Sequence, residues 1–299
     1  MTYKEACEKG SATLEKSGVP EAALDARLLL EHICGTDRNF LLVHGDSVLA
    51  PEKQAAYFAL VEKRSRRIPL QQLTGVQYFM GLPFQLDENV LIPRQDTEIL
   101  VEEVLRNLHD GMRVLDMCTG SGCILISLLH YTNDCQGIGV DISPDALKVA
   151  EKNARQLLGN PDMDLDDSGY GPEKAREQRQ VRFVEGDLFE KVDGMFDVIV
   201  SNPPYIPSGE IDGLMPEVRD HEPRLALDGS DDGLLFYRRI IDGCKDHLMR
   251  GGMLFFEIGY TQGEAVSRMM EQAGFLEPHI KKDYAGLDRV VFGTLGFEP

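Results

Sequence analysis

Two consecutive prolines follow a strongly apolar stretch of the chain, where "FDVIVS" (196–201) runs directly into Asn202-Pro203-Pro204-Tyr205. Proline has no backbone N–H and a fixed φ, and it restricts the residue before it, so the pair ends a strand. We expect the Pro203 carbonyl to be held in one direction as a result. The Asn202 side-chain oxygen is a second acceptor, and Tyr205 offers a flat aromatic face.

These residue types suit the methylation of a planar –NH2 group. Two fixed acceptors can take both of its hydrogens and turn its weakly nucleophilic nitrogen toward an activated methyl. Positioning and electrostatic stabilisation can supply most of the acceleration, so no strong base is required before transfer. The alternative is a rigid turn without chemistry. From average composition, the tetrapeptide occurs by chance in on the order of one chain in a thousand.

A glycine-containing turn and two acidic strand ends lie elsewhere in the sequence. In "VLDMCTGSGC", Asp116 closes a predicted strand, and Gly120 and Gly122 let the backbone turn tightly and approach a ligand. The next predicted strand ends in Asp141, roughly 20 residues beyond Gly122, where a carboxylate usually binds a ribose diol. Because ligands of open parallel sheets lie beyond the carboxyl ends of the strands, we expect these residues to share one pocket.

Asp187 and Leu188 follow a third predicted strand in "EGDLF" and could border an adenine, one accepting from its amino group and the other packing on its face. Each signal is weak alone, because any strand-to-helix turn can use G-x-G and a strand-end carboxylate is often only solvated. Together they describe a pocket for adenosine. A dinucleotide fingerprint would require a third glycine where this chain has Leu125. We therefore expect S-adenosylmethionine as cofactor and S-adenosylhomocysteine as product.

The elements that must position these residues alternate between strand and helix, which predicts an α/β fold with a mostly parallel sheet covered on both faces. The predicted strands cover 112–116, 136–140, 181–184, 196–201, 253–258, 277–281 and 289–294, and the predicted helices cover 97–108, 122–131, 144–157, 234–249 and 261–273. The polar segment 159–180 interrupts the alternation and is predicted to be a surface loop, to which we assign no function.

The N-terminal part shows helical spacing over 2–17, 20–34 and 51–67, which predicts a small helical bundle. Its last helix ends in "KRSRR" (63–67), cations that the helix dipole alone favours and that could otherwise form a binding patch. Aromatics, glycine and proline between 75 and 95 predict a β-hairpin linker.

Charge and cysteine content exclude several classes of protein. Residues 1–75 contain ten Lys/Arg and ten Asp/Glu, so all of the net charge of −19 lies after residue 75. This acidity disfavours a nucleic-acid substrate.

The six cysteines form no C-x-x-C pair and the N-terminus shows no signal-peptide pattern, which predicts free thiols and a cytoplasmic location. No apolar run approaches the ~20 residues of a membrane span, and no metal-ligand spacing is present.

Several motifs together resemble the peptide-chain release factor glutamine methyltransferases, the HemK family, and the resemblance covers essentially the whole chain. The motifs are "IPLQQLTGVQYFMGLPF", "VLIPRQDTE", "VLDMCTGSGCI", "SNPPYIP", "EPRLALDGSDDGL", "FEIGYTQ" and "DYAGLDRV". The resemblance implies a Rossmann-like class I methyltransferase sheet of about seven strands, joined to an N-terminal helical bundle. It also implies methyl transfer from S-adenosylmethionine to the side-chain amide of the glutamine in the Gly-Gly-Gln loop of release factors.

The resemblance implies a domain for each part: 1–75 for substrate docking, 76–95 as the hairpin linker and 96–299 for methyl transfer. The substrate glutamine would be held by Asn202, Pro203, Pro204 and Tyr205, with Asn202, Pro203 and Tyr205 as the catalytic residues. The cofactor would be lined by Asp116, Cys118, Thr119, Gly120, Ser121, Gly122, Asp141, Asp187, Leu188 and Asn202. We expect a release factor as protein partner, a monomer, and neither membrane nor direct nucleic-acid binding.

This chain departs from the family pattern at two positions. It has Cys118 where members commonly have glycine, so a backbone with φ > 0 would be strained there. It has Leu188 where an aromatic often stands, so aliphatic packing would replace stacking on the adenine. Arg94 and Glu98 match the family pattern near the active site, and helix entry explains them about as well.

Two other functions remain open from the residues alone. An adenine exocyclic-amino DNA methyltransferase could use the same motif, because adenine and a carboxamide share the planar –NH2 group; it would need a basic duplex-binding surface. A non-catalytic binding protein with a class I fold is the third possibility, against which the intact Asn202 and Asp141 argue.

Overall fold

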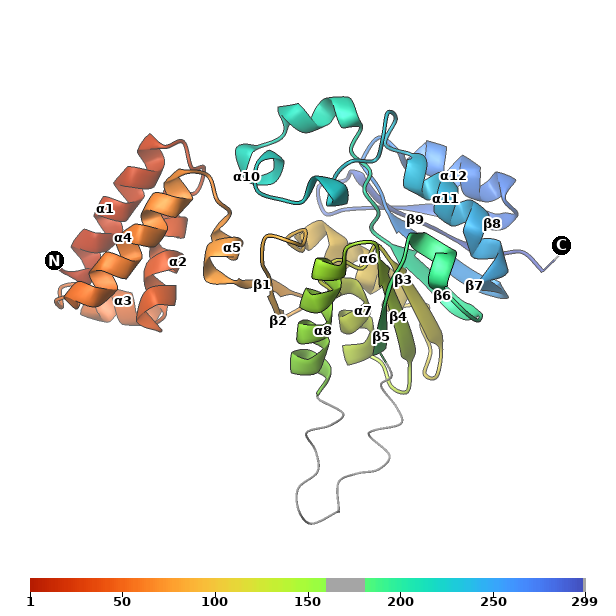
Figure 1. Cartoon of the computed structure of the whole chain (residues 1–299), viewed down its shortest axis with the longest axis horizontal. Coiled ribbons are helices and arrows are strands. Elements are labelled where there is room, and N and C mark those ends of the chain that lie inside the picture. The colour runs from red at the N-terminus through yellow and green to blue at the C-terminus, as the bar shows by residue number, and fades with distance from the viewer. Residues whose placement is uncertain (160–180, 298–299) are drawn as a thin grey trace, which may run out of the picture. The chain divides into compact units, whose positions relative to one another are not determined.

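The computed structural model describes residues 1–159 and 181–297 (Figure 1). The described chain forms two compact units. The helical unit comprises Met1–Val76 together with Leu214–His221, and the sheet unit comprises Gln77–Gly213 and Glu222–Pro299. All but the first residue of the predicted loop 159–180 lie outside the described residues. Among the residues described, no helix is both long and apolar enough to cross a membrane.

The helical unit is built around a small apolar core that includes Leu14, Leu29, Tyr57 and Val61. The three predicted helices are present, and the structure adds two short ones that the spacing did not reveal, because seven and five residues are too few to show a helical period. Its elements are α1 (Tyr3–Lys16), α2 (Ala22–Cys34), α3 (Arg38–His44), α4 (Pro51–Ser65), α5 (Leu70–Thr74) and α10 (Pro216–Arg219).

The inserted segment Leu214–His221 is held in the helical unit by ion pairs. Glu217 accepts from Arg64 at 2.9 Å and from Arg67 at 2.6 Å, and Arg64 also donates to Asp25 at 2.7 Å. Burial raises the pKa of Glu217, but the hydrogen bonds from Arg67 and Arg64 outweigh it and lower the pKa to about 2. Two cations of "KRSRR", Arg64 and Arg67, are thus used in ion pairs inside the unit, which neither the helix dipole nor an exposed patch had predicted.

The predicted hairpin is confirmed and is shorter than expected. Strands β1 (Val76–Phe79) and β2 (Leu82–Gln85) pair with each other, and Met80 and Gly81 connect them with φ of 50° and 75°. Two positive φ values in succession are typical of a type I′ turn, whose twist matches a two-residue hairpin. The remaining residues up to Arg94 are irregular and lead into α6 (Gln95–Leu105).

The predicted class I sheet is also confirmed: among the described residues seven strands form one sheet in the order β5-β4-β3-β6-β7-β9-β8. Neighbouring strands from β5 to β7 are parallel, and β9 runs antiparallel to both β7 and β8. The strands are β3 (Arg113–Met117), β4 (Gln136–Asp141), β5 (Val181–Glu185), β6 (Phe196–Ser201), β7 (Leu248–Glu257), β8 (Phe275–Lys282) and β9 (Asp288–Leu295).

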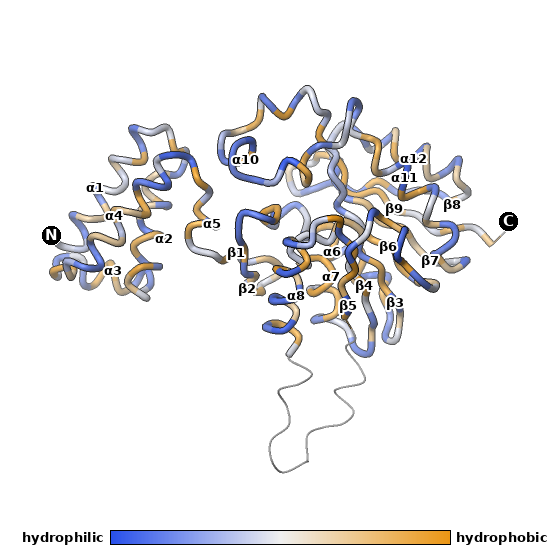
Figure 2. The backbone as a smooth tube through the Cα atoms, in the orientation of Figure 1, coloured by the Kyte–Doolittle hydropathy of each residue, from blue (hydrophilic) through white to orange (hydrophobic). Residues whose placement is uncertain are grey.

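Alternating side chains of the central strands feed two separate cores, one on each face of the sheet. Val114 and Val198 pack with α6, α7 (Cys123–His130) and α8 (Pro144–Leu158). Their neighbours Leu115 and Ile199 pack with α11 (Leu235–Gly243) and α12 (Gly263–Gln272). Both faces are covered, so consecutive residues at the centre of these strands, such as Val114 with Leu115 and Val198 with Ile199, are apolar. Helix α7, whose Cys123–Leu129 are all buried, is among the hydrophobic segments in Figure 2.

The helix predicted over 234–249 is too long. Helix α11 ends at Gly243, where an added Cβ would lie 2.5 Å from the Phe189 ring, and a 3-10 turn follows over Cys244–Asp246. From Leu248 the chain pairs with Phe196 of β6. Pairing with a distant strand overrides the local helical spacing there.

Candidate functional site

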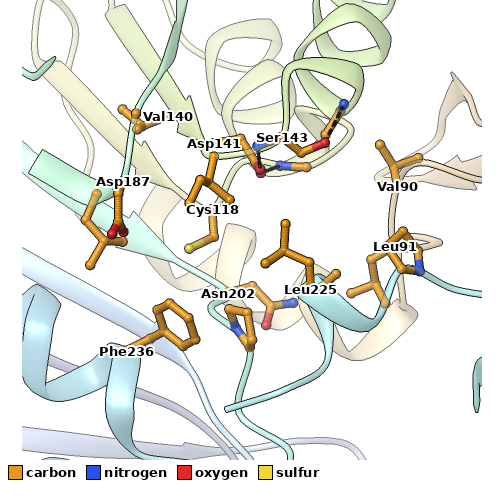
Figure 3. A pocket seen from close by; sticks show the side chains of 18 of the residues that line it. Val90, Leu91, Cys118, Val140, Asp141, Ser143, Asp187, Asn202, Leu225 and Phe236 are labelled. Atoms are coloured by element: carbon orange, nitrogen blue, oxygen red, sulfur yellow. Dashed lines mark hydrogen bonds between the residues drawn. The ribbon is translucent and has the colours of Figure 1, made fainter. Parts of the chain in front are cut away.

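A pocket lies in the sheet unit beyond the carboxyl ends of its central parallel strands (Figure 3). It brings together most of the predicted positions, from loops that follow β3, β4, β5 and β6. The predicted residues that line it are Cys118, Gly120, Asp141, Asp187, Leu188, Asn202 and Pro204. Parallel strands end at one edge of the sheet, which is why residues up to 86 positions apart in sequence meet here.

The Asp141 carboxylate organises one side of the pocket. Its Oδ2 accepts from the Gly120 N–H at 2.8 Å, and its Oδ1 accepts from the Ser143 N–H at 2.9 Å. Burial raises the pKa of Asp141, and backbone hydrogen bonds, led by that from Ser143, oppose the rise. The carboxylate therefore holds the glycine loop, and each oxygen, with one hydrogen bond from the backbone, can accept another from a ligand in the pocket that it lines.

Cys118 stands at the turn out of β3 with φ of 60°, so the strain foreseen for a non-glycine residue is present. Gly120 and Gly122 have φ of 54° and 78°, and a Cβ on Gly122 would lie 3.2 Å from that of Ala150 in α8. Burial raises the pKa of the Cys118 thiol, and Asp141 adds to the rise. The thiol is therefore neutral and contributes volume to the pocket wall.

Asp116 and Thr119 do not line the pocket. Asp116 is fully buried, and the Thr119 hydroxyl donates to its Oδ2 at 2.6 Å. This hydrogen bond stabilises the turn between β3 and the glycine loop. Ser121 and Gly122 also lie outside the lining, because they enter α7, and the Ser121 carbonyl accepts from the buried Asn153 amide at 3.0 Å. These residues shape the glycine loop through the packing under it.

The buried Asp116 makes stability depend on pH. Burial is the main cause that raises its pKa to about 7, so between about pH 4 and 7 the folded chain keeps a proton that the unfolded chain releases. The free energy of unfolding is therefore highest below about pH 4 with respect to this group, and it falls progressively as pH rises to about 7.

We expect Asp116→Asn to flatten this dependence. Relative to wild type, its free energy of unfolding should rise by on the order of 1–2 kcal/mol between pH 5 and pH 7. Urea unfolding at pH 5 and at pH 7 measures this free energy, and Asp193→Asn, at an exposed position, serves as control. Equal pH slopes for wild type and Asp116→Asn would contradict the prediction.

Asp187 and Leu188 reach the pocket at the end of β5. The Arg239 guanidinium donates to Asp187 Oδ2 at 2.8 Å, which leaves its other oxygen for a ligand. Leu188 is buried with φ of 55°. It presents an aliphatic side chain at the position where members of the family often have an aromatic one. Arg239 itself carried no signal in the sequence, because its partner is 52 positions away.

Asn202 and Pro204 of the Asn202–Tyr205 turn line the pocket, and Cys118 lies between Asn202 and Asp141 in the view of Figure 3. The Asn202 Nδ2 donates to the Thr97 hydroxyl at 3.4 Å, so its Oδ1 is the end left free. Pro203 and Tyr205 do not line the pocket. The Tyr205 hydroxyl instead donates to the buried Glu257 carboxylate at 3.2 Å.

Sequence reasoning missed part of the wall. These residues are mostly apolar and come from the segment after the hairpin, the ends of β4 and β5, the start of α8, the loop before α11, and α11 itself: Asn89, Val90, Leu91, Val140, Ile142, Ser143, Ala146, Gly186, Pro223, Leu225, Ala226, Phe236 and Arg239. The position of Ile142 directly after Asp141 could have indicated it. Phe236 gave no signal, because an aromatic on an apolar helix face is ordinary core.

Arg94 and Glu98 lie outside the pocket lining and hold neighbouring segments. Arg94 donates to both oxygens of Glu222, at 2.6 and 2.8 Å, and Glu98 accepts from the Met80 N–H at 2.6 Å. Among the residues for which the structure gives positions, no group of His, Cys, Asp and Glu could hold a metal ion.

The sheet order, its single reversed strand and the pocket at the strand ends define a class I methyltransferase domain. The structure of a methyltransferase from Pyrococcus furiosus aligns with 79% of this chain and 99% of its own, with a TM-score of 0.52 at 16% identity. A model described as "Methyltransferase domain" matches residues 108–167, and one described as "PrmC N-terminal domain" matches residues 5–75.

Curated relatives extend over nearly the whole chain. The release factor glutamine methyltransferase of Geobacter sulfurreducens is 42% identical over 95% of this chain and 93% of its own. That of Clostridium acetobutylicum is 38% identical over 99% of both. The chain therefore belongs to the release factor glutamine methyltransferase family and is an enzyme of that class, as the motifs predicted.

Proposed function

We propose that this enzyme transfers a methyl group from S-adenosylmethionine to the side-chain amide nitrogen of the glutamine in the Gly-Gly-Gln motif of peptide chain release factors. One observation supports the proposal most strongly: Asn202 lines the pocket with its Nδ2 engaged by Thr97, so an acceptor oxygen remains for an incoming –NH2 group.

The residues at the strand ends fit the proposed cofactor. Asp141 would accept from ribose hydroxyls, and Asp187 and Leu188 would border the adenine. The space beside Gly120, where an added Cβ would meet no atom within 4 Å, would accommodate the rest of the cofactor. S-adenosylmethionine supplies the activated methyl when bound, and the Asp141 carboxylate at the ribose suits its positive sulfonium charge.

On the substrate side, Asn202 Oδ1 and the Pro203 carbonyl would accept the two amide hydrogens and aim the nitrogen lone pair into the pocket. Tyr205 would limit the position of the planar amide. The protein contributes positioning of the two reactants and charge complementarity to the cofactor. Methyl transfer then needs no base beforehand, because the nitrogen becomes acidic once methylated and can release its proton afterwards.

The family membership disfavours an adenine exocyclic-amino DNA methyltransferase, and the net charge of −19 disfavours it further. The decisive experiment incubates the protein with methyl-labelled S-adenosylmethionine and, in parallel, a release factor or duplex DNA. We expect one added methyl, located by tandem mass spectrometry on the glutamine side chain. Label at adenine with none on the release factor would overturn the proposal.

We propose further that the helical unit, expected over residues 1–75, contributes a docking surface for the folded release factor. The "KRSRR" arginines 64 and 67 are engaged inside the unit, but Leu42 and Val43 of α3 are 73% and 75% exposed. Exposed neighbouring aliphatic side chains are typical of an interaction surface. A cytoplasmic site of action follows from this substrate, and the proposal treats the enzyme as a monomer.

We expect the double variant Leu42→Ser, Val43→Ser to lower kcat/KM for full-length release factor roughly tenfold, the loss of an apolar contact of ordinary strength. A short Gly-Gly-Gln peptide should be methylated within twofold of wild type, since it lacks the rest of the folded release factor that would dock on this surface. Leu276→Ser, on the 55% exposed leucine of β8, is the matched control. Equal losses on both substrates would contradict the docking role.

A further inference from the structure

Gln262 holds the end of the Asn202–Tyr205 turn through a fully engaged side-chain amide. It is nine-tenths buried, at the start of α12. Its Nε2 donates to the Tyr205 carbonyl at 2.9 Å and to the Gly233 carbonyl at 3.2 Å. Its Oε1 accepts from the Gly259 N–H at 2.9 Å. The two carbonyl oxygens need a donor and the Gly259 N–H needs an acceptor, and a side-chain amide supplies both. An ionised carboxylate could not, because it cannot donate a hydrogen bond.

The neighbourhood of this amide leaves no room for other arrangements. A Cβ at Gly233 would lie 2.3 Å from the Tyr205 carbonyl oxygen and 2.7 Å from Gln262 Nε2, and one at Gly229 would lie 2.8 Å from the Tyr205 carbonyl carbon. A Cβ at Gly259 would lie 2.9 Å from Gln262 Oε1. The glycines of "LDGSDDGL" and "FEIG" thus let these two segments pack closely against Tyr205 and Gln262.

Tyr205 is also held at its other end. Its hydroxyl donates to Glu257, whose segment "FEIGYTQ" also contains Gln262. The Tyr237 hydroxyl of α11 lies 3.0 Å from the Glu257 carbonyl and 3.2 Å from Gln262 Oε1, which ties both residues to the helix. One short segment at the carboxyl end of β7 therefore fixes both the backbone and the ring of Tyr205.

We propose that Gln262 is a positioning residue for the methyl transfer: by fixing the Tyr205 carbonyl it holds the Asn202–Tyr205 turn in the orientation that presents its acceptors to the substrate amide. The inference rests on the proposed function. Gln262 does not line the pocket, so it acts through Tyr205. The cofactor side of the pocket, formed by Asp141 and the Gly120 loop, lies on other strands and should be unaffected by its loss.

Two variants separate positioning from general stability. Gln262→Met keeps the volume and removes both donors, and Gln262→Glu places a carboxylate against two carbonyl oxygens. We expect each to lower kcat on a Gly-Gly-Gln peptide at least tenfold, while the dissociation constant of S-adenosylmethionine stays within twofold. Gln272→Glu, the same change at the exposed end of α12, should retain wild-type kcat.

The pH profile gives a readout that a purely structural role would not move. As pH falls from 8 to 6, protonation gives the carboxyl of Gln262→Glu one donor, so its activity relative to wild type should rise, and that of Gln262→Met should not. The ionisable groups near this position include Tyr205, Tyr237 and Glu257, with Arg289 and the Asp288 carboxylate beside Gly263, and all of them are common to all variants.

Methylation by Gln262→Met at more than half the wild-type kcat would overturn the inference, and so would a parallel loss of cofactor affinity. If Gln262→Glu does not fold, the Gln262→Met result decides. A wild-type protein that methylates neither peptide nor release factor would overturn the proposed function itself, and this inference with it.

Discussion

Replacing Asn202 with Ala should lower methyl transfer to a release factor at least a hundredfold, because the substrate amide loses an acceptor next to the reacting nitrogen. The Asn202 Nδ2 donates to the Thr97 hydroxyl at 3.4 Å, and the proposal assigns its Oδ1 as the acceptor for the substrate amide. An acceptor placed in advance costs no reorganisation during transfer, which is why its loss should appear in kcat.

Single-turnover rates with saturating S-adenosylmethionine measure this effect directly. Binding of the cofactor, followed by calorimetry, should change little, since the residues proposed to hold it end β4 and β5 and form the loop after β3. Asn133→Ala removes the same side chain at an exposed position and serves as control. Turnover of Asn202→Ala within threefold of wild type would rule out the proposed role.

Asp141→Ala should weaken S-adenosylmethionine binding by roughly 1.5–3 kcal/mol, the range for hydrogen bonds to a charged group. The ribose would lose its acceptor, and the glycine loop would lose the 2.8 Å hydrogen bond from the Gly120 N–H. Both losses act on the cofactor side of the pocket, so we expect the dissociation constant to rise about 10- to 150-fold.

Calorimetric titration of Asp141→Ala and of the exposed Asp193→Ala gives the comparison. The KM for a Gly-Gly-Gln peptide, measured with the cofactor at saturation, should stay near wild type. An unchanged dissociation constant would mean that other groups hold the ribose, and the assignment of Asp141 would then be wrong.

The sequence by itself determined the order of strands and helices in the sheet unit and the place of its chemistry. Apolar runs separated by helical spacing specify parallel strands, and parallel strands end at one edge. Residues that follow them, such as Gly120, Asp141, Leu188 and Asn202, must then meet, and the structure places these four in one pocket. This reasoning needs only local periodicity and one geometric rule.

The tertiary structure decided the contacts that join segments far apart in the chain. Arg64 and Glu217 are 153 positions apart, Gln262 and Tyr205 are 57 apart, and neither pairing leaves a local pattern. For the same reason α11 ended earlier than its spacing predicted. A hydrogen bond or ion pair depends on the distance between atoms in the folded chain, whereas periodicity in the sequence reports only which face of its own element a residue occupies.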